Sequence, residues 1–205
     1  METVDSSLLS FVFSTFPKGT VFFAEDLELT GIPPEAIRFS LSRLVASQSG
    51  VIRLGRGVYC VPDREPVSGK ILYPPMETIA EALAGRWKVR IAPCGARAAY
   101  LSGFSGVDAF ANTYVSDGSD QVFNLFNGNT IRFTKRKSQK VFSFVSPRMR
   151  NLVEALRYLG REAVGPEVEA VTAAALSGIS DEDFRLDVRL APAWIRKLLT
   201  EIRQG

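Results

Sequence analysis

VIRLGRGVYCV, residues 51–61, is the stretch that decides how the first part of this chain folds. Two short β-prone runs, residues 51–54 and 58–61, flank Gly55-Arg56-Gly57. Glycine adopts positive φ without strain, so the stretch predicts a tight β-hairpin. The tip carries an arginine, whereas a purely structural turn more often uses Asn, Asp or Gly. The sequence thus predicts a hairpin with a cationic tip.

Helical patterns precede this hairpin. Apolar residues recur at helical spacing over residues 6–16, and residues 24–29 are long enough for a short second helix. Pro33-Pro34 then opens a third helix, expected over residues 34–47, because proline is tolerated in a first turn. Helices followed by a hairpin with a cationic tip are typical of a winged helix-turn-helix, which we place at residues 1–65.

The third helix has two different faces. Its apolar face should pack on the first two helices, and its opposite face is polar and uncommitted. Arginine donates bidentate hydrogen bonds to guanine edges or phosphate, and serine contacts either. The candidate DNA-binding residues are Arg38, Ser42 and Arg43 on this helix and Arg53 and Arg56 on the wing. Winged helices also serve as protein-interaction modules, and that alternative stays open.

The remainder of the chain predicts a second domain. Residues 66–75 are polar and proline-containing and are expected to form a linker, although residues 70–73 could form a short edge strand. Residues 76–205 should form a mixed domain with a small antiparallel sheet and a C-terminal helical cluster. Asn127-Gly128 predicts a hairpin between residues 122–126 and 129–134, and residues 140–145 alternate as a strand would. The fold class is therefore α+β.

Five phenylalanines fall in the predicted strands of this second domain. They are most simply core residues, because a stacking platform for single-stranded nucleic acid would need them exposed beside basic side chains. The residues are Phe123, Phe126, Phe133, Phe142 and Phe144.

Composition argues against several kinds of site. The 205 residues include no histidine, which excludes Ser-His-Asp and Cys-His catalysis and imidazole-ligated metals. The two cysteines, Cys60 and Cys94, lack a metal-ligand spacing, and no paired-carboxylate or nucleotide-binding motif is present. We therefore expect no enzyme activity, no metal and no cofactor. No apolar run is long enough to span a membrane, and we expect a cytoplasmic protein.

Positive charge gathers in the middle of the chain. The net charge is only +3, yet residues 71–150 carry 11 basic and 5 acidic side chains. One interpretation is a secondary basic surface for DNA phosphates or an acidic partner. The other is a solvated hairpin edge, where lysines guard against edge-to-edge pairing. The residues of this basic run are Arg132, Lys135, Arg136, Lys137 and Lys140.

Several blocks of the sequence resemble one family. Ser42-Arg43-Leu44 precedes a glycine and the wing Arg56-Gly57-Val58-Tyr59, and residues 91–99 read IAPCGARAA. With the similar segments 113–118 and 128–133, this pattern resembles the AbiEi-type antitoxins of bacterial type IV toxin–antitoxin systems. Residues 101–106 match the family only loosely.

The resemblance implies a repressor-like antitoxin. Its winged helix would bind double-stranded DNA in its own promoter. Its second domain would counteract a nucleotidyltransferase-like toxin. The alternative is a module that neutralises a protein partner without reading DNA.

Overall fold

The computed structural model describes residues 4–107 and 111–205. The chain forms two compact units. Unit 1 comprises Met1–Arg86 and Phe123–Thr130, and unit 2 comprises Trp87–Val122 and Ile131–Gly205. The division thus falls between Arg86 and Trp87, later in the chain than expected, and eight residues of the second half belong with the first.

Unit 1 is a winged helix-turn-helix in its secondary structure. Helices α1 and α2 pack against each other and against the 3₁₀ helix η1, beside a three-stranded antiparallel sheet of order β1-β3-β2. The predicted helices and the hairpin are confirmed. The elements are α1 (Val4–Thr15), β1 (Val21–Phe23), η1 (Ala24–Thr30), α2 (Pro34–Ala46), β2 (Ile52–Gly55), β3 (Val58–Cys60), β4 (Asp63–Arg64), β5 (Ile71–Leu72) and α3 (Met76–Trp87).

One apolar cluster holds unit 1 together. It takes Leu8 and Val12 from α1, Ile37 and Leu41 from α2, and Phe22 from β1, each 0 or 1% exposed. The ring of Phe22 stacks between those of Phe16 and Tyr59, with centroids 4.7 and 5.8 Å away. This burial fixes α2 against the sheet, so that the polar face of α2 is left to solvent.

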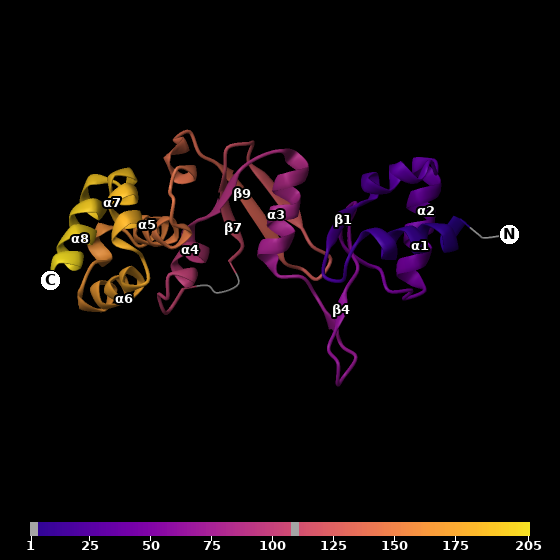
Figure 1. Ribbon diagram of the computed structural model, residues 1–205, viewed down its shortest axis with the longest axis horizontal. Helices are drawn as coiled ribbons and strands as arrows, with labels where there is room; N and C mark the ends of the chain where they lie inside the picture. Colours follow the sequence, from indigo (N-terminus) through magenta and orange to yellow (C-terminus); the bar gives the residue numbers. More distant parts are fainter. Residues whose placement is uncertain (1–3, 108–110) are drawn as a thin grey trace. The chain divides into compact units, whose positions relative to one another are not determined.

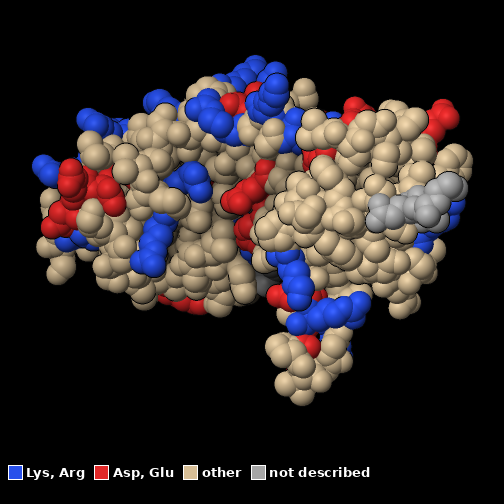
Figure 2. Space-filling model, turned by 45° about the vertical axis from the view of Figure 1, so that its right-hand side comes forward, with Lys and Arg blue, Asp and Glu red and all other residues tan. Residues whose placement is uncertain are grey.

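The expected linker contains a small hairpin instead. Strands β4 and β5 pair antiparallel, which bears out the short edge strand considered for residues 70–73. The hairpin stands out from the surface and carries basic side chains near its stem (Figure 2). Its tip residue Val67 is 96% exposed.

Unit 2 combines a four-stranded sheet with a helical cluster (Figure 1). The sheet order is β6-β7-β9-β8; β6 and β7 pair antiparallel as expected, whereas β7 and β9 run parallel. The Asn127-Gly128 turn between β8 and β9 is confirmed, with Gly128 at φ 84°. The elements are β6 (Ile91–Pro93), α4 (Gly95–Leu101), β7 (Thr113–Ser116), β8 (Gln121–Asn124), β9 (Thr130–Lys135), η2 (Gln139–Phe142), α5 (Pro147–Leu159), η3 (Arg161–Ala163), α6 (Pro166–Ser177), α7 (Asp181–Asp187), η4 (Val188–Leu190) and α8 (Ala193–Gln204).

The predicted strand at residues 140–145 is wrong. Residues Gln139–Phe142 form the 3₁₀ helix η2, which the Ser143 N–H caps by donating to the Lys140 carbonyl at 3.0 Å, and residues 143–145 belong to no strand. Val141 is buried with Ala92 and Val115, while the ring of Phe142 lies under the guanidinium of Arg90. The apolar side chains that suggested a strand are covered instead by the packing of Val141 and by the contact of Phe142 with Arg90, so no partner strand is needed.

The C-terminal helices surround α5. Met149, Leu152 and Leu156 of α5 are fully buried against α4, α6 and α8. Asp187, also fully buried, accepts hydrogen bonds from the Val145 and Ser146 N–H groups, both at 2.8 Å, just before α5 begins. The expected helical cluster is therefore present.

Candidate nucleic-acid interface

Arg38, Phe39 and Ser42 are among the exposed side chains on the solvent side of helix α2. Its buried face is formed by Ile37, Leu41 and Leu44. Arg38 and Ser42, one helical turn apart, share one flank, and Phe39 lies opposite the buried face. Phe39 is 72% exposed, which is unusual for a phenylalanine. Phe39 was not among the site residues selected from the sequence.

The wing is a hairpin with a two-residue turn. Gly55 pairs with Val58, so Arg56 and Gly57 form the turn, and only Gly57 adopts positive φ, at 73°. The prediction that both glycines serve the turn is thus half right. Gly55 is small for another reason: a Cβ there would lie 2.6 Å from the Phe123 ring and 3.0 Å from the Asn124 carbonyl oxygen.

The helix and the wing enclose a groove of about 630 Å³. Arg38 and Ser42 line it from α2, and Arg53, Arg56 and Tyr59 line it from the wing. Four of the five residues selected from the sequence are therefore brought together. Within the part of the chain that the structure describes, no hydrogen bond or ion pair engages Arg38 or Arg56. Their guanidinium groups are available to a ligand.

Arg53 is held in place by aromatic rings. Its guanidinium lies 4.9 Å from the Phe126 ring centroid and 5.9 Å from that of Tyr59, and its Nε donates to the Gly55 carbonyl at 3.3 Å. Phe126 is 63% exposed, so the prediction that it is a core residue is wrong. Phe126 is distant from the wing in sequence. The only local sign that it lies near the tip of a hairpin was the Asn127-Gly128 turn that follows it.

Arg43 is the exception among the five. It lies on the other flank of α2, and its Nη2 bonds the Asp5 carboxylate at 2.7 Å. Hydrogen bonds from Ser40 and Arg43 hold the pKa of Asp5 below its usual value. The structure thus separates Arg43 from the groove and engages it with α1.

The groove also contains an acidic group. Glu25 lines it from η1, and its carboxylate lies 3.5 Å from the guanidinium of Arg86. This partner neutralises Glu25 in part, so the three lining arginines leave the groove positively charged.

The five residues of the basic run do not form one surface. Arg132 and Lys135 project to opposite sides of β9 by strand alternation, and both are exposed. Lys137 is exposed, whereas the Nη1 of Arg136 turns inward to the buried Glu154 at 2.6 Å. Arg136 and Lys140 line a common pocket of unit 2.

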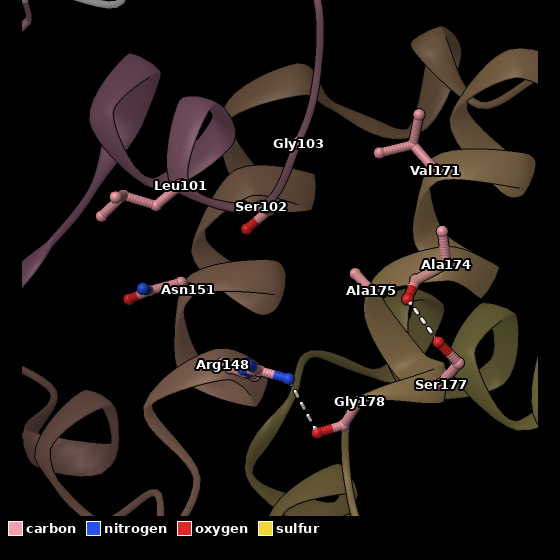
Figure 3. Close-up of a pocket in the computed structure, with 10 residues that line it drawn as sticks. All are labelled: Leu101, Ser102, Gly103, Arg148, Asn151, Val171, Ala174, Ala175, Ser177 and Gly178. Carbon is pink, nitrogen blue, oxygen red and sulfur yellow. Dashed lines mark hydrogen bonds between the residues drawn. The ribbon is translucent and has the colours of Figure 1, made fainter.

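Unit 2 has a cavity that sequence reasoning did not anticipate. It measures about 530 Å³ and lies between the end of α4, the first turns of α5, and α6 (Figure 3). Most of its lining side chains are small, and Arg148 donates to the Gly178 carbonyl at 3.2 Å. The buried Ser102 Oγ and Asn151 Oδ1 make no hydrogen bond within the described residues. The lining holds no pair of titratable groups suited to acid–base catalysis.

Metal-binding clusters and membrane spans are both absent from residues 4–107 and 111–205. No group of three or more Cys, Asp or Glu side chains there is placed to hold a metal ion. No helix in those residues combines the length and the apolar character needed to cross a bilayer.

Comparison with known proteins places the chain in a family. Residues 9–179 match the model of a family of unknown function, DUF6088. The chain belongs to this family. A comparison with curated proteins found no match to this chain.

A solved structure shares its fold. The crystal structure of the RV2827C protein from Mycobacterium tuberculosis is similar to this DUF6088 chain with a TM-score of 0.53 at 16% sequence identity. The similarity covers 98% of this chain and 78% of the other. At this identity the likeness concerns the fold alone.

Proposed function

We propose that unit 1 binds double-stranded DNA, with α2 in the major groove and the wing on the flanking backbone. The observation that supports this most is the groove in which Arg38, Ser42, Arg53 and Arg56 meet. Two of its arginines are uncommitted and a third is fixed between aromatic rings. Such a set suits recognition of guanine edges and phosphates.

Each side chain has a role in this proposal. Arg38 and Ser42 contact base edges, and Phe39 contacts thymine methyl groups, which are the apolar features of the major groove. Arg53 and Arg56 contact phosphates and set the position of the module. Arg43 contributes chiefly through its ion pair with Asp5.

We further propose that the protein is a cytoplasmic autorepressor and the antitoxin of a type IV toxin–antitoxin system. The resemblance of the wing and of residues 91–99 to AbiEi-type antitoxins supports this role. Its DNA partner would be its own promoter, and its functional counterpart would be a nucleotidyltransferase-like toxin. We propose no catalytic activity for the chain itself.

A protein-interaction role for the same surface is the second candidate. It is favoured by the 72% exposure of Phe39, because large exposed apolar side chains often mark partner contacts. In that case the chain would show no preference for its promoter, and Phe39→Ala would abolish toxin neutralisation.

The test is promoter binding measured by fluorescence anisotropy with the full chain. We expect a preference for the upstream duplex over random duplex, and Arg38→Ala should weaken upstream binding by about 1–3 kcal/mol. Arg56→Ala should lower the slope of log affinity against log salt concentration by about one. Arg43→Ala is the matched control from the same helix and should have the smaller effect. Equal affinity for upstream and random duplex would contradict sequence-specific reading.

The antitoxin role has a separate test. Co-expression with the protein encoded beside it should restore growth that this neighbour alone arrests. Restoration by a chain lacking promoter affinity would separate neutralisation from DNA binding, whereas growth arrest unaffected by co-expression would remove the antitoxin role.

A further inference from the structure

A second cationic site lies in unit 2, in a pocket of about 270 Å³. Three segments supply its basic side chains: Arg136 directly follows β9, Lys140 lies in η2, and Arg157 lies in α5. Two members of the basic run are thereby joined to an arginine that is distant in sequence.

A buried carboxylate organises this pocket. Glu154 is only 3% exposed, and its Oε1 lies 2.6 Å from Arg136 Nη1 and 4.0 Å from Arg157 Nε. A buried charge is costly unless it is paired, so Glu154 constrains the guanidinium of Arg136. Three cationic groups and one carboxylate line the pocket and leave it with two positive charges in excess.

The remaining lining groups are suited to a small anionic ligand. The Ser138 side chain is a hydrogen-bonding group at the rim, and no ion pair in the described residues engages Lys140. Val141, Phe144 and Leu190 supply apolar walls. The pocket volume lies just below that of pockets for drug-sized ligands, which leaves space for an anionic group and a compact organic part.

We propose that this pocket binds a small phosphate monoester, with its phosphate between Arg136, Lys140 and Arg157. Arginine presents several N–H donors in a planar fork that matches phosphate oxygens, and lysine adds a point charge. An excess of two positive charges complements a phosphate dianion better than a single carboxylate. The proposal does not depend on DNA binding by unit 1.

The test uses the full chain and three probes in isothermal titration calorimetry: adenosine 5′-monophosphate, inorganic phosphate and adenosine. We expect saturable binding of the two phosphates and none of adenosine. Arg157→Ala and Lys140→Ala should each weaken binding of the monophosphate by at least about tenfold. Lys137→Ala removes an exposed cation of the same run that does not line the pocket, and it should change the affinity little.

Arg136→Ala alone would deprive the buried Glu154 of its nearest partner and leave only Arg157 at 4.0 Å. The variant tested is therefore Arg136→Met combined with Glu154→Leu, which removes both members of the close pair. This double variant should remain folded by circular dichroism. It keeps the excess of two positive charges but lacks the Arg136 guanidinium fork, so it should bind the monophosphate more weakly. Adenosine binding as tightly as its monophosphate would overturn the proposal. So would equal losses in the Lys137 and Lys140 variants, or the absence of saturable binding of either phosphate.

Discussion

Arg38, Arg43 and Arg53 are the same residue type in three different situations. Arg38 is free to meet a ligand, Arg43 pairs with Asp5, and Arg53 is fixed by Tyr59 and Phe126. Sequence spacing placed all three on the correct elements. It could not place Asp5 beside Arg43 or Phe126 over Arg53, because both partners are distant in sequence. Helical periodicity does not report such contacts.

Phe39 offers a prediction at the same scale. If it contacts thymine methyl groups, then replacing thymine by uracil in the bound DNA should weaken binding by the native chain. Phe39→Ala should bind thymine and uracil duplexes alike, because the methyl contact is already lost. Anisotropy titrations of the two proteins on the two duplexes form the double-mutant cycle that measures this. An unchanged thymine preference in the variant would argue against the contact.

Two buried thiols should make the stability of the protein fall at alkaline pH. Burial raises the pKa of Cys60 and Cys94 to about 11, with Glu154 adding to the shift at Cys94. Because the folded state favours the neutral thiols, their contribution is present below the unfolded pKa near 9.0 and is lost as the pH rises toward 11. Urea unfolding across this range should show falling stability. The Cys60→Ala, Cys94→Ala double variant should lose that part of the fall.

Substitution of a glycine in the wing tests how closely β2 packs against residues 123–124. Gly55→Ala should destabilise the protein by about 1–3 kcal/mol, because the new methyl group would overlap the Phe123 ring. Gly85→Ala is the matched control: it lies in α3 with open space around it, and it should stabilise by about 0.5–1 kcal/mol. Thermal unfolding of both variants decides the matter. Equal shifts would show that Gly55 has no packing role.

Most elements could be predicted because each is encoded locally. Pro34 marks the start of α2, Asn127-Gly128 forms a hairpin turn, and apolar spacing marks the C-terminal helices. The segment of η2 could not be predicted, because a short helical turn that buries Val141 and covers the Phe142 ring with Arg90 accounts for these apolar residues as well as a strand does. The parallel pairing of β7 with β9 is likewise set by tertiary contacts, not by either strand alone.

At the scale of the whole molecule, unit 1 depends on residues supplied late in the chain. Leu125 is 6% exposed, it bridges to Gly55, and the Phe126 N–H donates to the Leu54 carbonyl at 3.0 Å. A fragment ending at Arg86 lacks these contacts. Hydrogen exchange of the β2 and β3 amides should therefore be faster in the fragment than in the full chain.

Leu125→Ala in the full chain provides the comparison for this fragment. It should destabilise unit 1 by about 2–4 kcal/mol, because it truncates the buried Leu125 side chain. Undiminished protection of the wing in both proteins would show that residues 123–130 are dispensable. The sequence alone predicted a self-contained module at residues 1–65, because linear order gives no sign that a later turn completes it.

The discontinuity of unit 1 also sets an order of events during synthesis. The ribosome must release the chain beyond Thr130 before the wing can receive its last contacts. Domains generally fold as units while the chain emerges, N-terminal ones first. Here unit 1 can complete its fold only after residues 123–130 have been synthesised. A prematurely terminated nascent chain would therefore contain every groove arginine and still lack the ring that holds Arg53 in position.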